Sequence, residues 1–347
     1  MKDKTLLGNK WVRFFGPLAI MALAAFLLRD KMPFLATGMS EMLRARPGGL
    51  IASFIAVALS MWAMAEVMRR LLNAGGYAIK PVDTLALTFI ANSWSSTFPG
   101  GAAISTVYQF RTMRTWAVSV MVSSWFIMLS GALSTVWLIA LGLISIFFLG
   151  ASFSLTPLIG SAIILIGLAL LVWWAANNPQ PSSRFVIRIL HGAGKVLRKD
   201  FSAQQESLKK HFFQLDAVRL SPTQFLIVAL LSLSNWVLDI LALWLCVGAV
   251  TGIYPAFEWP ENHTTVLGIT LAFVTAKIVG SAQITPAGVG PVEAAMTASL
   301  VAVGMTASSA FGVVFVYRII SFAFITIIGW LWYFVSVARG GMRAQEA

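Results

Sequence analysis

Four ionisable residues lie within apolar stretches in the second half of the sequence, where a charge is costly. They are Asp239, Lys277, Glu293 and Arg318, and their formal charges sum to zero. Ionisable groups inside a bilayer usually face one another or a water-filled cavity, because exposure to lipid is unfavourable. Arg318 lies 12 residues beyond Thr306, which places it roughly 18 Å along a helix. Its guanidinium could bind a phosphate through two parallel hydrogen bonds, or form a structural ion pair with Glu293 or Asp239.

Two further apolar blocks are broken by proline and glycine. Residues 84–110 contain Pro99-Gly100-Gly101, and residues 266–303 contain Pro286-Ala287-Gly288-Val289-Gly290. A helix amino terminus carries unpaired N–H groups and a partial positive charge, so a helix that begins inside a membrane offers an anion site. Glycine would let the backbone approach a ligand there, with Pro286 in the first helical position and Thr285 as its cap. Alternatively, proline and glycine only allow close helix packing.

The elements that position these residues are membrane-spanning helices. Hydrophobic residues make up 58% of the 347 positions and charged residues only 11%, whereas a soluble domain carries about 25% charged residues. A helix needs about 20 apolar residues to cross a bilayer core of about 30 Å. Six blocks qualify, and they are residues 14–28, 50–68, 117–148, 155–175, 225–250 and 310–337. We predict an all-α polytopic membrane protein in which residues 1–347 form a single integral membrane domain.

The halves of the two broken blocks are each short for a span. We therefore predict re-entrant broken-helix hairpins over residues 84–114 and 265–304. Two ordinary short spans, or one kinked helix, are the alternatives. With the amino terminus inside, this topology places 19 of the 25 basic residues on the cytoplasmic side, as the positive-inside rule requires. We expect a multi-pass plasma-membrane protein with both termini cytoplasmic, and residues 177–221 as a basic cytoplasmic loop.

The two hairpins would enter the membrane from opposite sides. The first would enter from the inside, between a span that runs inward and one that runs outward, and the second would enter from the outside, between spans of the opposite sense. Hydroxyl residues precede both breaks, as Ser95-Ser96-Thr97 and as Ser281 with Thr285. This arrangement is an inverted-topology repeat, which is typical of transporters that hold a substrate near the membrane midplane.

Other function classes find little support. The net charge of +12 is explained by cytoplasmic basic residues, and no motif of a nucleic-acid-binding module occurs, so we expect no nucleic acid partner. Cys246 is the only cysteine, and His191, His211 and His263 have no metal-ligand spacing. A phosphate-binding loop and a serine elbow are also missing from the sequence. We expect no catalytic residue, no metal site, no cofactor and no enzymatic activity.

The broken blocks resemble a known family. Ile284-Thr285-Pro286-Ala287-Gly288-Val289-Gly290-Pro291-Val292-Glu293-Ala294-Ala295, then Gly304 and Tyr317-Arg318, resemble the carboxy-terminal signature of the lysylphosphatidylglycerol synthase transmembrane-region family. Asn92, Pro99-Gly100-Gly101, Tyr108 and Arg111 resemble its earlier motif in the actinobacterial form. Ala287 replaces the first glycine of the usual Pro-Gly-Gly. The resemblance spans nearly the whole chain.

In two-part members of that family, this membrane region is associated with moving aminoacylated phospholipid between leaflets, while a soluble domain makes the lipid. The chain ends at Ala347, just past its last predicted span. We therefore expect a stand-alone member that lacks the synthase domain, and the resemblance does not imply lipid aminoacylation.

We predict that the protein binds and translocates an anionic phospholipid or a polyprenyl-phosphate lipid between leaflets, as a flippase does. Arg111, Lys277 and Arg318 would contact the phosphate, and Glu293 would orient Arg318. The ends of the broken helices would line the cavity, and they are Pro99, Gly100, Gly101, Pro286, Gly288 and Gly290. One alternative is a non-catalytic accessory subunit of a cell-envelope lipid or glycan synthase, docked through the basic loop. A membrane glycosyltransferase is the other.

Overall fold

The computed structural model describes residues 42–148, 167, 220–257, 263–283 and 285–338. Within these ranges four helices are long and apolar enough to cross a membrane. They are α3 (Pro47–Ala74), α6 (Val120–Phe148), α10 (Pro222–Thr251) and the continuous helix Ala307–Ala338. These helices confirm the spans predicted at residues 50–68, 117–148, 225–250 and 310–337 as long apolar helices. The blocks 14–28 and 155–175, and nearly all of loop 177–221, lie outside the described residues.

Local sequence explains where the helices begin. Four helices carry proline in the first turn, where its missing N–H leaves no hydrogen bond unmade. Ser221 and Gln224 form a reciprocal capping box at the start of α10. The hydroxyl of Thr306 accepts from the backbone N–H of Ser309 and caps the last long helix. These signals are legible in the sequence alone.

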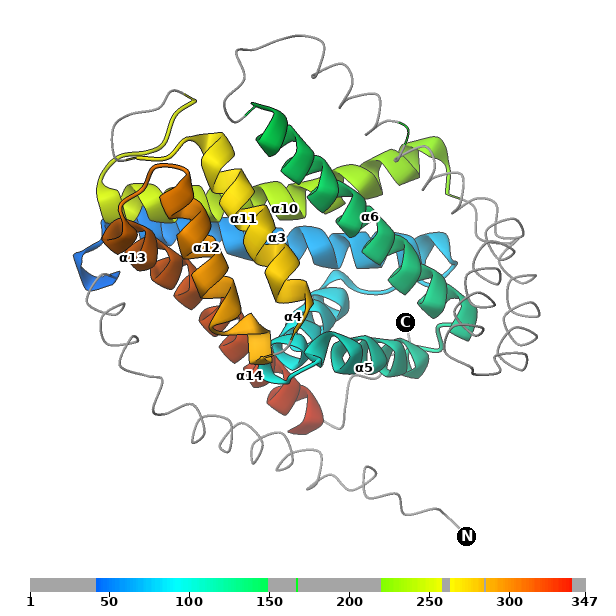
Figure 1. The fold of residues 1–347 in the computed structure, drawn as a ribbon. Helices are drawn as coiled ribbons and strands as arrows, with labels where there is room; N and C mark the ends of the chain where they lie inside the picture. Colours follow the sequence, from blue (N-terminus) through cyan, green and yellow to red (C-terminus); the bar gives the residue numbers. More distant parts are fainter. Residues whose placement is uncertain (1–41, 149–166, 168–219, 258–262, 284, 339–347) are drawn as a thin grey trace, which may run out of the picture.

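The broken blocks fold as helical hairpins. The first consists of α4 (Pro81–Thr97) and α5 (Gly101–Thr115), and the second of α11 (Val266–Ser281), the short 3-10 helix η4 (Pro286–Gly288) and α12 (Pro291–Ala302). The longest arm has 17 residues, fewer than the roughly 20 that a span requires. In each hairpin the two arms pack on each other (Figure 1).

Contacts between the arms show that the chain reverses at each break. In the first hairpin the hydroxyl of Ser105 donates to the carbonyl oxygen of Ala91 at 2.7 Å, and the rings of Trp94 and Tyr108 stack. In the second, a side-chain carbon on Gly268 would meet Val303 at 3.0 Å. The hairpin prediction is confirmed in its breaks and its chain reversal, and the single kinked helix is wrong. The side from which each hairpin enters a membrane stays a prediction.

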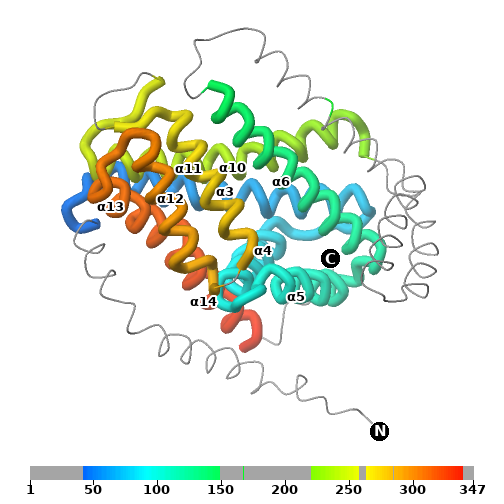
Figure 2. Tube along the Cα trace, viewed as in Figure 1, coloured from blue at the N-terminus to red at the C-terminus, as the bar shows by residue number. Residues whose placement is uncertain are grey.

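Each half of the described fold therefore consists of a span, a hairpin and a span. Helix α3 packs along α10, and the two run side by side across the molecule (Figure 2). Arm α4 packs against α14 (Ile325–Ala338) of the second half, whereas α11 packs against α6 of the first half. In each half, the first arm of the hairpin thus packs against the last span of the other half. A two-fold relation between repeats produces such equivalent contacts.

Gly329 is needed for the close approach of two helices, α14 and α4. A carbon added to Gly329 of α14 would lie 2.2 Å from the carbonyl oxygen of Phe89 in α4, so only glycine permits this crossing. The hydroxyl of Ser93 lies between the same helices and donates to the carbonyl oxygen of Thr326 at 2.9 Å. The α4 arm is thereby fixed to the last span, and its polar face is directed to the centre of the molecule.

Candidate functional site

The tips of the two hairpins meet at one side chain, Gln283. Its backbone oxygen accepts from the N–H of Gly100 at 3.1 Å, and its side-chain oxygen accepts from the N–H of Ala102 at 2.6 Å. The amide nitrogen donates to the hydroxyl of Ser95 at 3.2 Å. The amino end of α5 is therefore already capped by the other hairpin. The prediction of an open anion site at this helix end does not match the structure.

The tip residues adopt backbone conformations that their sequence explains in part. Gly100 and Gly290 have φ values of 62° and 95°, in the left-handed region that glycine enters freely. Ala287 also lies there, with φ of 52° and ψ of 14°, although a side chain makes this conformation costly. Gly101 serves packing, because a carbon added to it would lie 2.3 Å from the carbonyl oxygen of Ser95. The packing interpretation thus applies at Gly101, whereas Gly100 and Gly290 serve the backbone conformation, and the approach of a ligand to these glycines stays a prediction.

A cavity of about 420 Å³ lies beside the meeting point of the tips. Its lining comes from α3, α4, α6, α10, α11, α12 and the last long helix, together with Gln283 and Ala287. One part of the wall is apolar, with Val57, Met61 and Met296 among its residues. Hydroxyl and amide side chains form another part, and they are Ser60, Thr88, Asn92, Ser95, Ser96, Ser134, Asn235, Ser281 and Ser321. Three charged residues of the described chain complete it, namely Asp239, Lys277 and Arg318.

Lys277 of α11 pairs with Asp239 of α10. The ammonium nitrogen lies 2.9 Å from Oδ2 of Asp239. It also lies 5.3 Å from the ring centre of Trp236 and 4.9 Å from that of Phe273, within the range of a cation–π attraction. The side chain of Lys277 remains 36% exposed, so its charge is compensated without being closed off from the cavity.

Arg318 pairs with Glu293 of α12. Its Nε lies 2.5 Å from Oε1 of Glu293, and its Nη2 donates to the carbonyl oxygen of Ala287 at 3.0 Å. The second carboxylate oxygen of Glu293 accepts from the N–H of Gly290 at 2.6 Å. Two of the five guanidinium N–H groups are used in these bonds to described residues, which leaves others for a ligand. Glu293 itself is not among the cavity-lining residues. It positions Arg318 from outside the cavity.

The last long helix changes its winding next to Arg318. It consists of α13 (Ala307–Arg318), the π-helical segment η5 (Ile319–Phe324) and α14. The guanidinium of Arg318 lies 4.7 Å from the ring centre of Phe322, one turn further along this segment. Short π-helical segments inside α-helices are frequent at functional sites. No sequence signal that we recognised indicates this segment.

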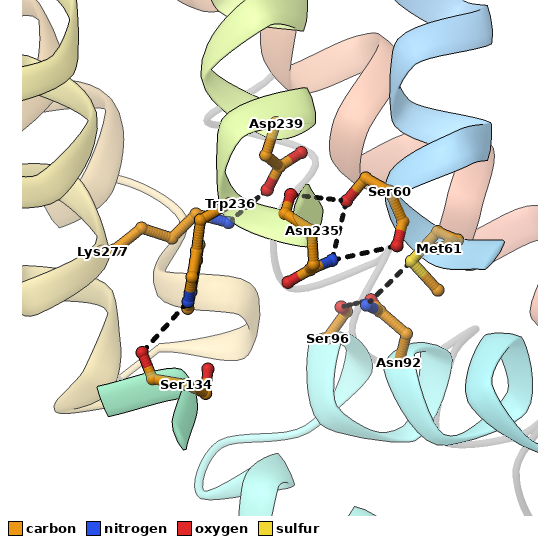
Figure 3. A network of polar contacts seen from close by, with 9 residues as sticks. All are labelled: Ser60, Met61, Asn92, Ser96, Ser134, Asn235, Trp236, Asp239 and Lys277. Atoms are coloured by element: carbon orange, nitrogen blue, oxygen red, sulfur yellow. Dashed lines mark hydrogen bonds and ion pairs between the residues drawn. The ribbon is translucent and has the colours of Figure 1, made fainter. Parts of the chain in front are cut away.

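The neutral polar residues of the cavity wall are held in a network across four helices. Asn235 of α10 donates through Nδ2 to the backbone oxygen and the hydroxyl of Ser60 in α3, at 3.0 and 2.8 Å. Trp236 donates to the carbonyl oxygen of Ser134 in α6 at 3.0 Å, and Ser96 donates to Asn92 within α4 at 3.2 Å. Figure 3 shows these side chains converging from their helices. The wall residues are therefore held in place by hydrogen bonds to one another and to the backbone.

The structure brings together some of the predicted site residues and separates others. Lys277 and Arg318 line the cavity, and Glu293 contacts Arg318. The remaining predicted residues are not among the lining residues; they are Arg111, Pro99, Gly100, Gly101, Pro286, Gly288 and Gly290. Arg111 lies exposed on α5. Sequence reasoning missed Gln283, Asn235, Trp236 and Ser60 as site residues, because single polar residues in apolar helices carry no spacing pattern.

Metal binding finds no candidate in the part of the chain that the structure describes. Within it, no group of three or more His, Cys, Asp or Glu residues is placed to hold a metal ion. The cavity instead offers hydrogen-bond donors, acceptors and two compensated cations. These groups suit an anionic or polar ligand.

Spans, broken hairpins and a charge-bearing cavity between them define a multi-pass α-helical membrane protein with an internal polar site. The model of the family described as "Lysylphosphatidylglycerol synthase TM region" matches residues 14–329. The chain therefore belongs to this family, and the predicted resemblance is confirmed. Membership indicates a lipid-related membrane domain. A comparison with curated proteins gives no match.

Proposed function

We propose that the protein binds an anionic phospholipid or a polyprenyl-phosphate lipid by its phosphate and moves it between the leaflets of the plasma membrane. The observation that supports this most is the position of Arg318 in the cavity wall, with its guanidinium held by Glu293 and with N–H groups still available. A planar guanidinium binds a phosphate through parallel hydrogen bonds. Lys277 would supply a second, point-like charge.

The pairing of both cations with carboxylates suits release as well as binding. Asp239 and Glu293 offset the charges of Lys277 and Arg318, so these four residues together are neutral and the partly buried cations are tolerated. An arriving phosphate would compete with Asp239 for Lys277 and would add to the Glu293 pair at Arg318. Such a site holds an anion less tightly than two unpaired cations would. Weaker binding suits a transporter, because a transporter must release its substrate.

Arg318 also connects ligand binding to the second hairpin tip. Its Nη2 donates to the carbonyl oxygen of Ala287, and the tip is linked to the first hairpin through Gln283. A phosphate that drew Nη2 away from Ala287 would loosen the second tip. Separation of the tips would then let the headgroup cross while the hydrocarbon chains stay in the bilayer. In this mechanism the protein acts as a transporter and carries out no chemical step. The proposed topology places both termini on the cytoplasmic side.

The test is lipid exchange by the purified protein in liposomes. With a fluorescent anionic phospholipid in both leaflets, an impermeant quencher should reach nearly all of the label, against about half in protein-free vesicles. A labelled phosphatidylcholine in parallel vesicles should remain half protected. Exchange that required an added synthase would favour the accessory-subunit alternative. Absence of exchange for every anionic lipid would overturn the proposal.

A further inference from the structure

A second cavity of about 290 Å³ adjoins the first. It lies between α3, α4, α5 and α6, within the first half of the fold. The two cavities share five lining residues, which are Met64, Thr88, Asn92, Ser95 and Ser134. A ligand bound at Lys277 and Arg318 would therefore have this second compartment beside it.

The second compartment differs from the first in charge. None of the described residues that line it is charged, whereas Asp239, Lys277 and Arg318 line the first. Its polar lining consists of hydroxyl and amide groups, namely Thr88, Asn92, Ser95, Ser105, Thr106, Gln109, Ser130 and Ser134. Apolar contact surface comes from Met64, Met68, Phe126 and Ile127.

The hydrogen bonds of these hydroxyl groups determine what they offer to a ligand. Thr88 donates to the carbonyl oxygen of Thr84 at 2.8 Å, and Thr106 donates to that of Ala102 at 2.8 Å. Ser105 and Ser130 likewise donate to backbone oxygens of Ala91 and Ile127. A hydroxyl that has used its proton still has lone pairs that accept hydrogen bonds. These four hydroxyls therefore offer acceptors, while the amides of Asn92 and Gln109 and the hydroxyls of Ser95 and Ser134 offer donors. Such a mixture suits a polyol, whose O–H groups both donate and accept.

We propose that this compartment binds the uncharged polyhydroxyl part of the lipid headgroup, a polyol or a sugar joined to the phosphate. This inference rests on the proposed function and narrows its substrate class. A bare phosphate headgroup would leave the acceptors without donors. An ammonium headgroup would find no carboxylate in the compartment, and Asp239 next to it is paired with Lys277. The apolar lining would contact the C–H faces of the polyol.

Gly131 of α6 allows the compartment to be filled without disturbing the protein. It lines the second cavity only, and a side-chain carbon added there meets no heavy atom within 4 Å. Leucine is also a better helix former than glycine. Gly48 of α3 is the matched control, because it too has open space around it and lines neither cavity.

The experiment compares lipid binding by native mass spectrometry with lipid exchange in liposomes. The lipids are phosphatidylinositol, phosphatidylglycerol, phosphatidic acid and phosphatidylethanolamine. The wild type should prefer the two polyol lipids over the other two by about tenfold or more, since each added hydrogen bond contributes up to about a factor of ten. Gly131→Leu should lose this preference and keep its binding of phosphatidic acid. Gly48→Leu should match the wild type.

A second pair of variants removes hydrogen bonding without changing volume. Thr106→Val should weaken phosphatidylinositol binding severalfold and leave phosphatidic acid unaffected. Thr135→Val is its control, because the Thr135 hydroxyl also donates to the carbonyl four residues earlier, at 2.9 Å, and lines neither cavity.

Equal treatment of all four lipids by the wild type, or an unchanged preference in Gly131→Leu, would overturn the inference. Selective binding of polyol lipids without any exchange would support the inference and overturn translocation. Failure to bind any of the four lipids would overturn the inference, and with it the proposal that the substrate is an anionic phospholipid.

Discussion

Replacing Arg318 separates a ligand-binding role from a purely structural one. Arg318 and Glu293 side chains are 16% and 20% exposed, and the Nε to Oε1 distance is 2.5 Å. In Arg318→Gln, Glu293 keeps its bond from the N–H of Gly290 but loses the cation. Breaking a buried pair costs about 3–5 kcal/mol, and we expect the lower end, about 3 kcal/mol, because both groups stay near the open cavity.

Two further variants complete the comparison. Arg318→Gln combined with Glu293→Gln removes the uncompensated carboxylate and should recover most of the stability but none of the lipid exchange. Arg318→Lys keeps the charge and loses the planar fork, so stability should change little while exchange falls about tenfold.

Thermal unfolding in mild detergent and lipid exchange in liposomes measure the two properties on the same preparations. Normal exchange by Arg318→Gln would refute the assignment of Arg318 as a phosphate ligand. Full recovery of exchange by the double variant would refute it as well.

Further predictions follow from the tips and the exposed face. Ala287→Gly should stabilise the protein by about 0.5–1 kcal/mol in thermal unfolding, because φ of 52° disfavours alanine; a loss would mean that the alanine methyl packs favourably. Gln283→Ala removes two hydrogen bonds between the tips. A cysteine introduced at Ser96 should then react with a thiol reagent more than about tenfold faster, because the tips separate more often; an unchanged rate would show that Gln283 does not hold the tips together. Arg111→Gln should exchange lipid normally, since Arg111 lies outside the cavity. A large loss of lipid exchange would show that Arg111 takes part in the site. Single cysteines near Arg114 and near Thr264 should react with an impermeant thiol reagent from the inside and the outside respectively, and reaction from one side would exclude the inverted repeat.

Much of the fold follows from local sequence. Long apolar blocks, prolines in first helical turns and the Pro-Gly breaks locate the described spans and both hairpins to within a few residues. Charge balance among Asp239, Lys277, Glu293 and Arg318 indicates internal pairing before the structure is known. It does not assign the partners, because two acids and two bases can pair in two ways. The observed pairs join α10 to α11 and α12 to α13.

The neutral part of the site is harder to predict. Gln283 lies near a break, but its contacts with Gly100 and Ala102 depend on the approach of a hairpin 181 residues away. Asn235 and Ser60 meet only because α3 packs along α10. The sequence predicts Arg111 and the tip glycines at the ligand site, because helix breaks inside a membrane are expected to line it. The structure instead places much of the lining before the breaks, at Asn92 and Ser95 of α4 and at Lys277 of α11.

Access to the cavity from the two sides of the membrane tests translocation most directly. The reporter is Ser96→Cys in a Cys246→Ala background, since Ser96 lines the cavity and Cys246 is the only native cysteine. An impermeant thiol reagent is added to right-side-out vesicles and, separately, to inside-out vesicles. A transporter that alternates access predicts reaction in both preparations, with the rate reduced by bound anionic lipid. Reaction in only one of them would contradict translocation through this cavity.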